Sequence, residues 1–341
     1  MKGTAFWRPL PWQQDLWLEQ TSLILQQRLP HALLMIGGAG IGKRWFARAL
    51  IAFALCEQRS GYACGQCRSC VQLGAGTHPN ASVVGVDGHL GLAPTADGHA
   101  EQGLVHWEPD EDRKRRDITI DAARSLIGTL GLASHYGSDR YALIEPADLL
   151  NASSANALLK TIEEPPAGTH LVLVTERPQA LLPTLRSRCQ RLRFAAPDEA
   201  AARAWMAEQG VRDDDALRLA LGAPLRALEL ARGDGIALRR QWADLWSAVG
   251  SGRKDPLTAA AAIDKDSVGE HLQWAQQWLT EQLRAQLGAP LPRRESIAQM
   301  MQDVFDAQRR AAGNAQPQLL MESLFVRWLR LSRAAPPVAT R

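Results

Sequence analysis

The feature that most constrains the fold is a glycine-rich stretch, Gly37 to Lys43, which lies between an apolar run and a helix-like segment. The apolar run, residues 33–36, has the length of a buried strand, and residues 43–55 are apolar on one face. Strand, glycine loop and helix in this order are the context of a phosphate-binding loop, whose backbone N–H groups face an anion at the helix N-terminus. The stretch therefore predicts the first unit of an α/β nucleotide-binding fold.

The loop departs from the full pattern, G-x-x-x-x-G-K-[ST], at its last position. Gly37, Gly42 and Lys43 match, but Arg44 stands where a serine or threonine hydroxyl would bind Mg²⁺. A guanidinium carries a fixed positive charge and cannot be that ligand. A phosphate group can still bind such a loop, but the Mg²⁺-assisted hydrolysis of ATP is compromised.

A second acidic position is altered as well. After the predicted strand 141–144, an ATPase of this kind needs an aspartate for Mg²⁺ and a glutamate that orients the attacking water. This chain has Glu145 and then Pro146, with Asp148 two residues further on. Proline cannot polarise water, so two independent catalytic parts are altered. The alternative is that Glu145 or Asp148 binds Mg²⁺ and that the chain is an active ATPase.

Four of the five cysteines lie within fifteen residues, with the spacing C-x7-C-x2-C-x2-C: Cys56, Cys64, Cys67 and Cys70. Four thiolates suit a tetrahedral Zn²⁺ ion and leave no ligand position open, so we predict a structural zinc module over residues 56–78. An iron–sulfur cluster and four free thiols are the alternatives. Cys189 is remote in sequence and is predicted to be a small buried residue.

Bulk properties exclude some classes of protein. With 39 basic and 36 acidic side chains the net charge is +3, which does not indicate nucleic-acid binding by overall charge. No window approaches the roughly 18 apolar residues of a membrane span, and the first residues lack a signal-peptide pattern. We therefore expect a cytoplasmic protein, and the length of 341 residues predicts two or three domains.

The remaining pattern separates an α/β part from a helical part. Further strands are expected at residues 82–86, 171–174 and 190–194, and further helices at 121–130 and 151–164, the last ending before Pro165. Residues 87–117 are predicted to be a long exposed loop, whose basic run at 113–116 is either solvated or in contact with DNA. After Pro197 only helices are expected, interrupted near Gly222–Pro224, with five tryptophans at core spacings between residues 237 and 332.

Two motifs carry a resemblance to a known family. Residues 156–166, NALLKTIEEPP, and residues 185–189, LRSRC, resemble bacterial DNA polymerase III clamp-loader subunits of the AAA+ class. The resemblance covers nearly the whole chain and is most specific in residues 31–78 and 141–194. Within the family, the ATPase subunit gamma/tau and the delta prime branch share the cysteine cluster. The altered ATP motifs and the chain length are more similar to the delta prime branch.

The resemblance implies a domain order and partners. An AAA+ domain would span residues 1–196, a helical lid 197–236 and a helical collar for oligomerisation 237–332, followed by a tail, 333–341. The partners implied are the gamma/tau and delta subunits in a hetero-oligomeric ring, and through that ring the sliding clamp and primer–template DNA. No intrinsic ATPase activity is expected, although the chain would be part of a DNA polymerase holoenzyme, a nucleotidyltransferase.

The resemblance also implies roles for single residues. Arg188 matches the arginine finger that the family presents in trans to ATP on a neighbouring subunit, although a purely structural role for Arg188 is the alternative. Thr175 matches the first sensor position, whereas Arg226 is one position away from the lid arginine and does not take over that role. Lys160 lies either on a solvated helix face or against DNA or a partner. Two other functions remain open: an active clamp-loader ATPase, and a zinc-dependent DNA-binding protein.

Overall fold

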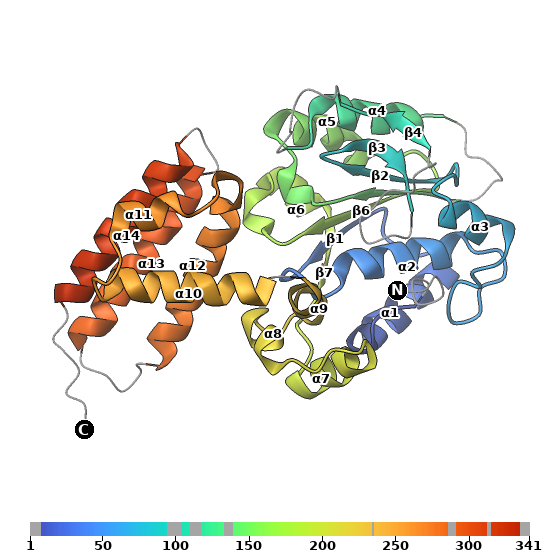
Figure 1. Cartoon of the computed structure of the whole chain (residues 1–341). Helices are drawn as coiled ribbons and strands as arrows, with labels where there is room; N and C mark the ends of the chain where they lie inside the picture. Colours follow the sequence, from blue (N-terminus) through green and yellow to red (C-terminus); the bar gives the residue numbers. More distant parts are fainter. Residues whose placement is uncertain are drawn as a thin grey trace. The chain divides into compact units, whose positions relative to one another are not determined.

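The computed structural model of the protein describes residues 8–93, 104–109, 117–132, 139–233, 235–285, 291–311 and 315–334. The chain forms two compact units, Met1–Leu228 and Glu229–Arg341. Figure 1 shows a sheet-containing first unit and a helical second unit. The finer division of the chain at residues 196 and 236 stays a prediction.

A mixed β-sheet forms the centre of the first unit. Its order within the described residues is β4(Val105–Trp107), β3(Gly88–Gly91), β2(Ala81–Gly85), β5(Arg140–Ile144), β6(Thr169–Thr175), β1(Ala32–Ile36) and β7(Gln190–Arg193). The neighbouring strands β2, β5, β6, β1 and β7 run parallel to one another. Strand β3 pairs antiparallel with β2, and β4 pairs antiparallel with β3. Strand β1 runs parallel to its neighbours β6 and β7, so the loop that follows β1 emerges at the carboxyl edge of the parallel strands. The strands expected from the apolar runs are confirmed.

Helices cover both faces of this sheet (Figure 1). They are α1(Gln14–Leu25), α2(Lys43–Leu55), α3(Arg68–Gly74), α4(Ile120–Leu130), α5(Ala152–Glu163) and α6(Pro183–Arg188), with short 3-10 turns η2(Pro11–Gln13), η4(Ala147–Leu149) and η5(Pro178–Ala180). On one face, Leu34 and Leu173 of the sheet pack against Leu126, Leu158 and Leu185 of α4, α5 and α6, and all five side chains are fully buried. Helix α2 covers the opposite face. These two layers fix the positions of the loops at the carboxyl edge.

The expectation of a long exposed loop over residues 87–117 is wrong where the structure describes that segment. Strands β3 and β4 lie within it and extend the sheet. His89 of β3 is fully buried, bonds through Nδ1 to Ser125 Oγ at 2.9 Å and stacks on His106 of β4. These short strands lack the apolar alternation that marks a strand in sequence. The basic run at 113–116 lies outside the described residues.

Only helices follow β7 in the described part of the chain, as expected. Three short ones come first, α7(Glu199–Glu208), α8(Asp214–Leu219) and α9(Pro224–Arg232). Asp198 and Asp213 cap α7 and α8 by accepting backbone N–H bonds from Ala201 and Ala216 at 2.7 and 3.0 Å. The predicted break near Gly222 is confirmed, because α8 ends before it and α9 begins at Pro224.

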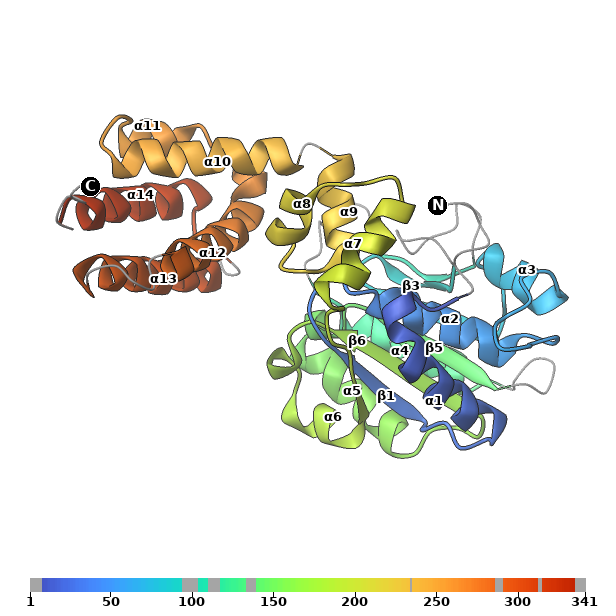
Figure 2. The ribbon, with the colours of Figure 1, turned by 90° about the horizontal axis from the view of Figure 1, so that it is seen from below.

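The second unit is built from α10(Gly235–Gly250), α11(Pro256–Ala261), α12(Val268–Ala285), α13(Leu291–Ala311) and α14(Pro317–Ala334), with a 3-10 turn, η6(Lys265–Ser267). Helix α14 packs against α10, α11 and α13 (Figure 2). Trp246 and Trp274 are fully buried in its core, and the indole N–H of Trp246 donates to His271 Nε2 at 2.8 Å. None of the described helices has the length and apolar character needed to span a membrane.

Candidate nucleotide-like and metal sites

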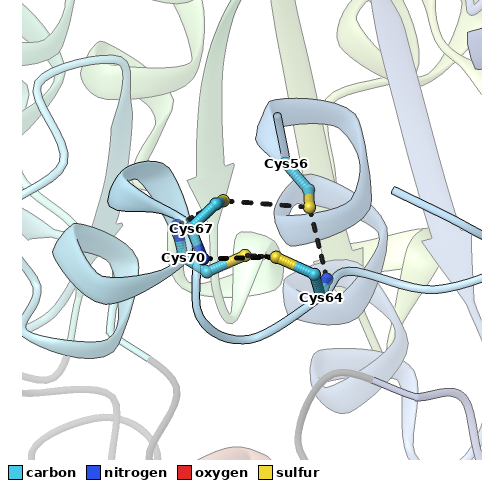
Figure 3. A group of neighbouring side chains, drawn as sticks. All are labelled: Cys56, Cys64, Cys67 and Cys70. Carbon is cyan, nitrogen blue, oxygen red and sulfur yellow. Dashed lines mark hydrogen bonds between the residues drawn. The ribbon is translucent and has the colours of Figure 1, made fainter. Parts of the chain in front are cut away.

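The four clustered cysteines come together in space at the end of α2 and the start of α3 (Figure 3). Their sulfur atoms all lie within 4.8 Å of one another, and the Sγ–Sγ distances of Cys56–Cys67 and Cys64–Cys70 are both 3.9 Å. A tetrahedral zinc–thiolate site with bonds of about 2.3 Å separates its sulfurs by about 3.8 Å. These distances exclude disulfides, whose S–S bond is about 2 Å long. The cluster can hold a metal ion.

Backbone N–H groups favour an ionised thiol at Cys64, whereas burial opposes ionisation at two of its neighbours. The N–H groups of Cys64 and Cys67 point at Cys56 Sγ and Cys64 Sγ, each at 3.2 Å. Hydrogen bonds from backbone N–H groups, first that of Gln66, hold the pKa of Cys64 below its usual value, while burial raises the pKa of Cys56 and Cys70. A bound cation would offset that cost of burying negative charge. The donor set therefore fits a structural metal.

The segment after α3 is fixed by a histidine that the sequence did not single out. Buried His78 bonds through Nε2 to Ser69 Oγ at 2.7 Å and accepts the N–H of Asn80 on Nδ1 at 3.1 Å. Burial lowers the pKa of His78 to about 4, so the ring is neutral near pH 7. This contact ties the cysteine-bearing helix α3 to the start of β2.

The glycine loop lies between β1 and α2, as its pattern predicts, and it is covered by other parts of the chain. Trp12 Nε1 and Gln13 Nε2 donate to the carbonyl of Ile41 at 3.0 and 3.1 Å, and Gln13 also donates to the carbonyl of Gly42. Gly42 has a φ of 93°, and a Cβ atom there would collide with Leu10 and Gln13. The segment before α1 therefore closes one side of the loop.

Helix α9 covers another part of the same loop. The backbone N–H of Leu225 donates to the carbonyl of Gly40 at 3.0 Å, and a Cβ atom at Gly40 would collide with Arg226. Gly40 has a φ of 69°, so both the backbone conformation and the close approach require glycine. Arg226, which sequence reasoning left without a role, thus contacts the loop through its backbone and Cβ.

The lysine of the glycine loop, Lys43, points into the protein. Lys43 is 4% exposed, and its Nζ donates to the carbonyl of Gly38 in the loop at 2.5 Å, with the Glu176 carboxylate 4.0 Å away. Burial lowers the pKa of Lys43. Arg44, at the position of the missing hydroxyl, is exposed and directed to solvent. The ammonium group of Lys43 therefore makes its hydrogen bond to the loop itself.

Both carboxylates that could bind Mg²⁺ are paired with arginine. Glu145 forms a two-pronged ion pair with Arg48 of α2: Arg48 Nη1 donates to one carboxylate oxygen at 2.8 Å and Nη2 donates to the other. The side chains of Arg48 and Glu145 are 3% and 8% exposed. Asp148 accepts from Thr175 Oγ1 at 2.8 Å and from Arg177 Nε at 3.0 Å. Sequence reasoning did not find Arg48, whose only local signal is its charge within an apolar helix.

Arg188 lies at the last position of α6 and is partly exposed, with 37% of its side chain accessible. Its Nη1 donates to the carbonyl of Thr184 at 2.9 Å, and its Nε and Nη2 contact Glu163 Oε1 at the end of α5.

The next residue, Cys189, is buried, which raises the pKa of its thiol to about 11 and agrees with its predicted packing role. Lys160 is exposed on α5.

The chain is similar to replication proteins. A family model described as DNA polymerase III, delta subunit, matches residues 12–198. A DNA polymerase III subunit delta' of Pseudomonas aeruginosa is 33% identical over 350 residues, which cover 94% of this chain and 97% of the relative. A protein of the same name from Escherichia coli is 33% identical over 265 residues, covering 76% of this chain and 71% of its own length.

Other similarities are more partial. A DNA polymerase III subunit gamma/tau of Mycobacterium tuberculosis is 31% identical over 195 residues, which cover 56% of this chain and 29% of that protein. Among solved structures, a DNA polymerase III gamma subunit-related protein of Thermotoga maritima aligns with a TM-score of 0.47 and 15% identity. That alignment covers 93% of this chain and 99% of the other.

Proposed function

The chain belongs to the delta prime family of bacterial DNA polymerase III subunits, and from that premise we propose that it is a clamp-loader subunit that does not hydrolyse ATP itself. In this proposal residues 1–196 form an AAA+ domain, residues 197–236 form its lid, and residues 237–332 form a collar that joins a ring of gamma/tau and delta subunits. The ring loads the sliding clamp on primer–template DNA.

One observation carries the proposal: the lysine and both carboxylates of the nucleotide-like site already have partners within the chain. Lys43 bonds to Gly38, Glu145 to Arg48 and Asp148 to Arg177, while Arg44 replaces the hydroxyl ligand. To gain Glu145 as a ligand, Mg²⁺ would have to displace its buried ion pair with Arg48. This argues against the alternative of an active gamma/tau-type ATPase.

Arg188 supplies what such a subunit can contribute to catalysis. Its side chain is partly exposed at the end of α6, where a neighbouring subunit's ATP can meet it. A guanidinium supplied in trans stabilises the charge that develops on the transferred phosphoryl group, and removing one costs about 10³–10⁵ in rate where it is the main stabiliser. In a ring with several active sites the loss is smaller, because one interface is affected.

The metal of the cysteine cluster is proposed to be zinc. Four sulfur ligands at near-tetrahedral spacing leave no position for water or substrate, so the ion would stabilise the fold and take no part in the reaction. Cys56, which directly follows α2, and Cys70 of α3 would then be joined through the ion. The module would keep these two helices together beside the sheet.

The test compares two substitutions in the reconstituted clamp-loader complex. We expect Arg188→Ala to lower DNA-stimulated ATP hydrolysis and clamp loading while the subunit still folds and enters the ring. We expect Lys43→Ala to leave both rates unchanged. The opposite pattern, a loss with Lys43→Ala alone, would assign the chain to the ATPase class, and unchanged rates with Arg188→Ala would make Arg188 structural. Strongly salt-dependent DNA binding by the isolated chain would favour a DNA-binding protein.

A further inference from the structure

Arg188 is held by a defined partner, Glu163, which lies twenty-five residues away in sequence. Glu163 is the last residue of α5 and Arg188 is the last residue of α6. The Nε and Nη2 groups of Arg188 both contact Glu163 Oε1, while Nη1 donates to the carbonyl of Thr184 at 2.9 Å. The side chain of Arg188 is thus fixed along two of its edges by its own subunit.

These contacts leave part of the guanidinium available. An arginine has five N–H donors, of which Glu163 and Thr184 take three. The two that remain belong to Nη1 and Nη2, one on each nitrogen. Because 37% of the side chain is exposed, these donors can reach a group outside the subunit. Arginine binds phosphate oxygens through N–H donors of its two terminal nitrogens.

The position of Glu163 is not explained by helix stability. A carboxylate at the C-terminus of a helix faces the negative end of the helix dipole, which is unfavourable. An ion pair with both partners substantially exposed also contributes little to the stability of a fold. The glutamate therefore fits a role in orienting Arg188 better than a role in holding α5 and α6 together.

We infer that Glu163 is a positioning residue that fixes the guanidinium of Arg188 with its two free donors directed at the neighbouring subunit's phosphate. This inference rests on the proposed role of Arg188 as a finger in trans. Without Glu163, the long side chain samples other rotamers and reaches the phosphate in the productive orientation less often. Misplacement of a catalytic group by about 1 Å can cost about a hundredfold in rate.

The chain offers a matched control. Glu164 is the adjacent glutamate and is also exposed, and within the described ranges no ion pair of its carboxylate with a cationic side chain is found. Replacing either residue by alanine removes one negative charge from the same end of α5. Only Glu163→Ala removes the contact with Arg188, so a difference between the two variants reports on that contact and not on local charge.

The experiment uses the reconstituted complex and measures the Arg188-dependent part of DNA-stimulated ATP hydrolysis, which is the wild-type rate minus the Arg188→Ala rate. We expect Glu163→Ala to reduce this part about tenfold or more through kcat, with little change in the KM for ATP. Glu164→Ala keeps the full Arg188-dependent part. Glu163→Gln retains an intermediate part, because its amide oxygen still accepts from Nε.

A double variant separates positioning from a general defect. We expect Glu163→Ala to have no further effect in the Arg188→Ala background, because both changes remove the same interaction. Equal losses with Glu163→Ala and Glu164→Ala, a wild-type rate with Glu163→Ala, or a rate above wild type would each overturn the inference. If instead Arg188→Ala leaves the rate unchanged, the proposed finger itself fails, and the two failures are distinguished.

Discussion

The buried ion pair between Arg48 and Glu145 makes a strong prediction about stability. Both side chains are almost entirely excluded from solvent, and Arg48 is also bonded through Nε to the carbonyl of Ala93 at 3.0 Å. Arg48→Met keeps most of the side-chain volume and removes the charge. Glu145 is then left as a buried carboxylate without its cation, which costs about 3–5 kcal/mol.

The size of this effect can be converted into a melting temperature. A change of 1 kcal/mol shifts the Tm of a domain of 150–250 residues by about 2–4 °C, so Arg48→Met lowers the Tm of the first unit by about 6–20 °C. Differential scanning calorimetry measures this shift. Arg44→Met is the control, because Arg44 lies one turn earlier on α2, is exposed, and should change stability by less than about 0.5 kcal/mol.

A double substitution checks the cause. In Arg48→Met with Glu145→Gln neither partner is charged, so most of the stability lost in the single variant returns. If Arg48→Met melts within about 1 °C of Arg44→Met, the pair contributes nothing and the reasoning is refuted. A double variant as unstable as the sum of its single changes would instead assign the loss to packing.

Two further predictions concern the metal site and a buried histidine. Cys64→Ser removes one of four ligands, so we expect loss of about one zinc ion per chain by elemental analysis together with a lower Tm; a wild-type preparation without zinc contradicts this. Burial lowers the pKa of His271 to about 3, below the value of about 6.5 in the unfolded chain, so the unfolded state binds the extra proton as pH falls. The free energy of unfolding of the second unit therefore falls by about 2 kcal/mol between pH 6.5 and pH 5.0. Urea unfolding of His271→Gln should show a flatter dependence of this free energy on pH. An unchanged dependence means that His271 is not the group responsible.

The core of the fold was predictable because its signals are local. The apolar run at residues 33–36 and the helix that ends before Pro165 each carry their own pattern and stop signal. The short strands β3 and β4 carry no such pattern. His89 is buried there because Ser125 and His106 surround it, and both come from other elements of the chain. That environment exists only once the sheet has formed.

The candidate sites divide in the same way. Spacing alone brought out the four cysteines, and residue type alone brought out Arg44 and Pro146 as departures from an ATPase pattern. The partners of the altered site were not predictable, because Arg48 and Glu145 are 97 residues apart in sequence. The contact between Gly40 and α9 likewise depends on how the helices after β7 pack on the loop. The sequence therefore shows which positions depart from the ATPase pattern, and the structure shows which side chains lie against those positions.

Two arginines show how the same chemistry can be used inside and outside a subunit. Arg48 is buried, and its guanidinium is held in a two-pronged pair with Glu145, so its charge is neutralised within the fold. Arg188 also pairs with a glutamate, through its Nε and Nη2 groups, but more than a third of its side chain is exposed. An arginine can act on a neighbouring subunit only if its guanidinium reaches solvent and keeps donors free. Arg188 meets both conditions, whereas the guanidinium of Arg48 is buried and does not reach solvent. The proposed catalytic contribution of this chain therefore lies at the end of α6 and outside its own phosphate loop.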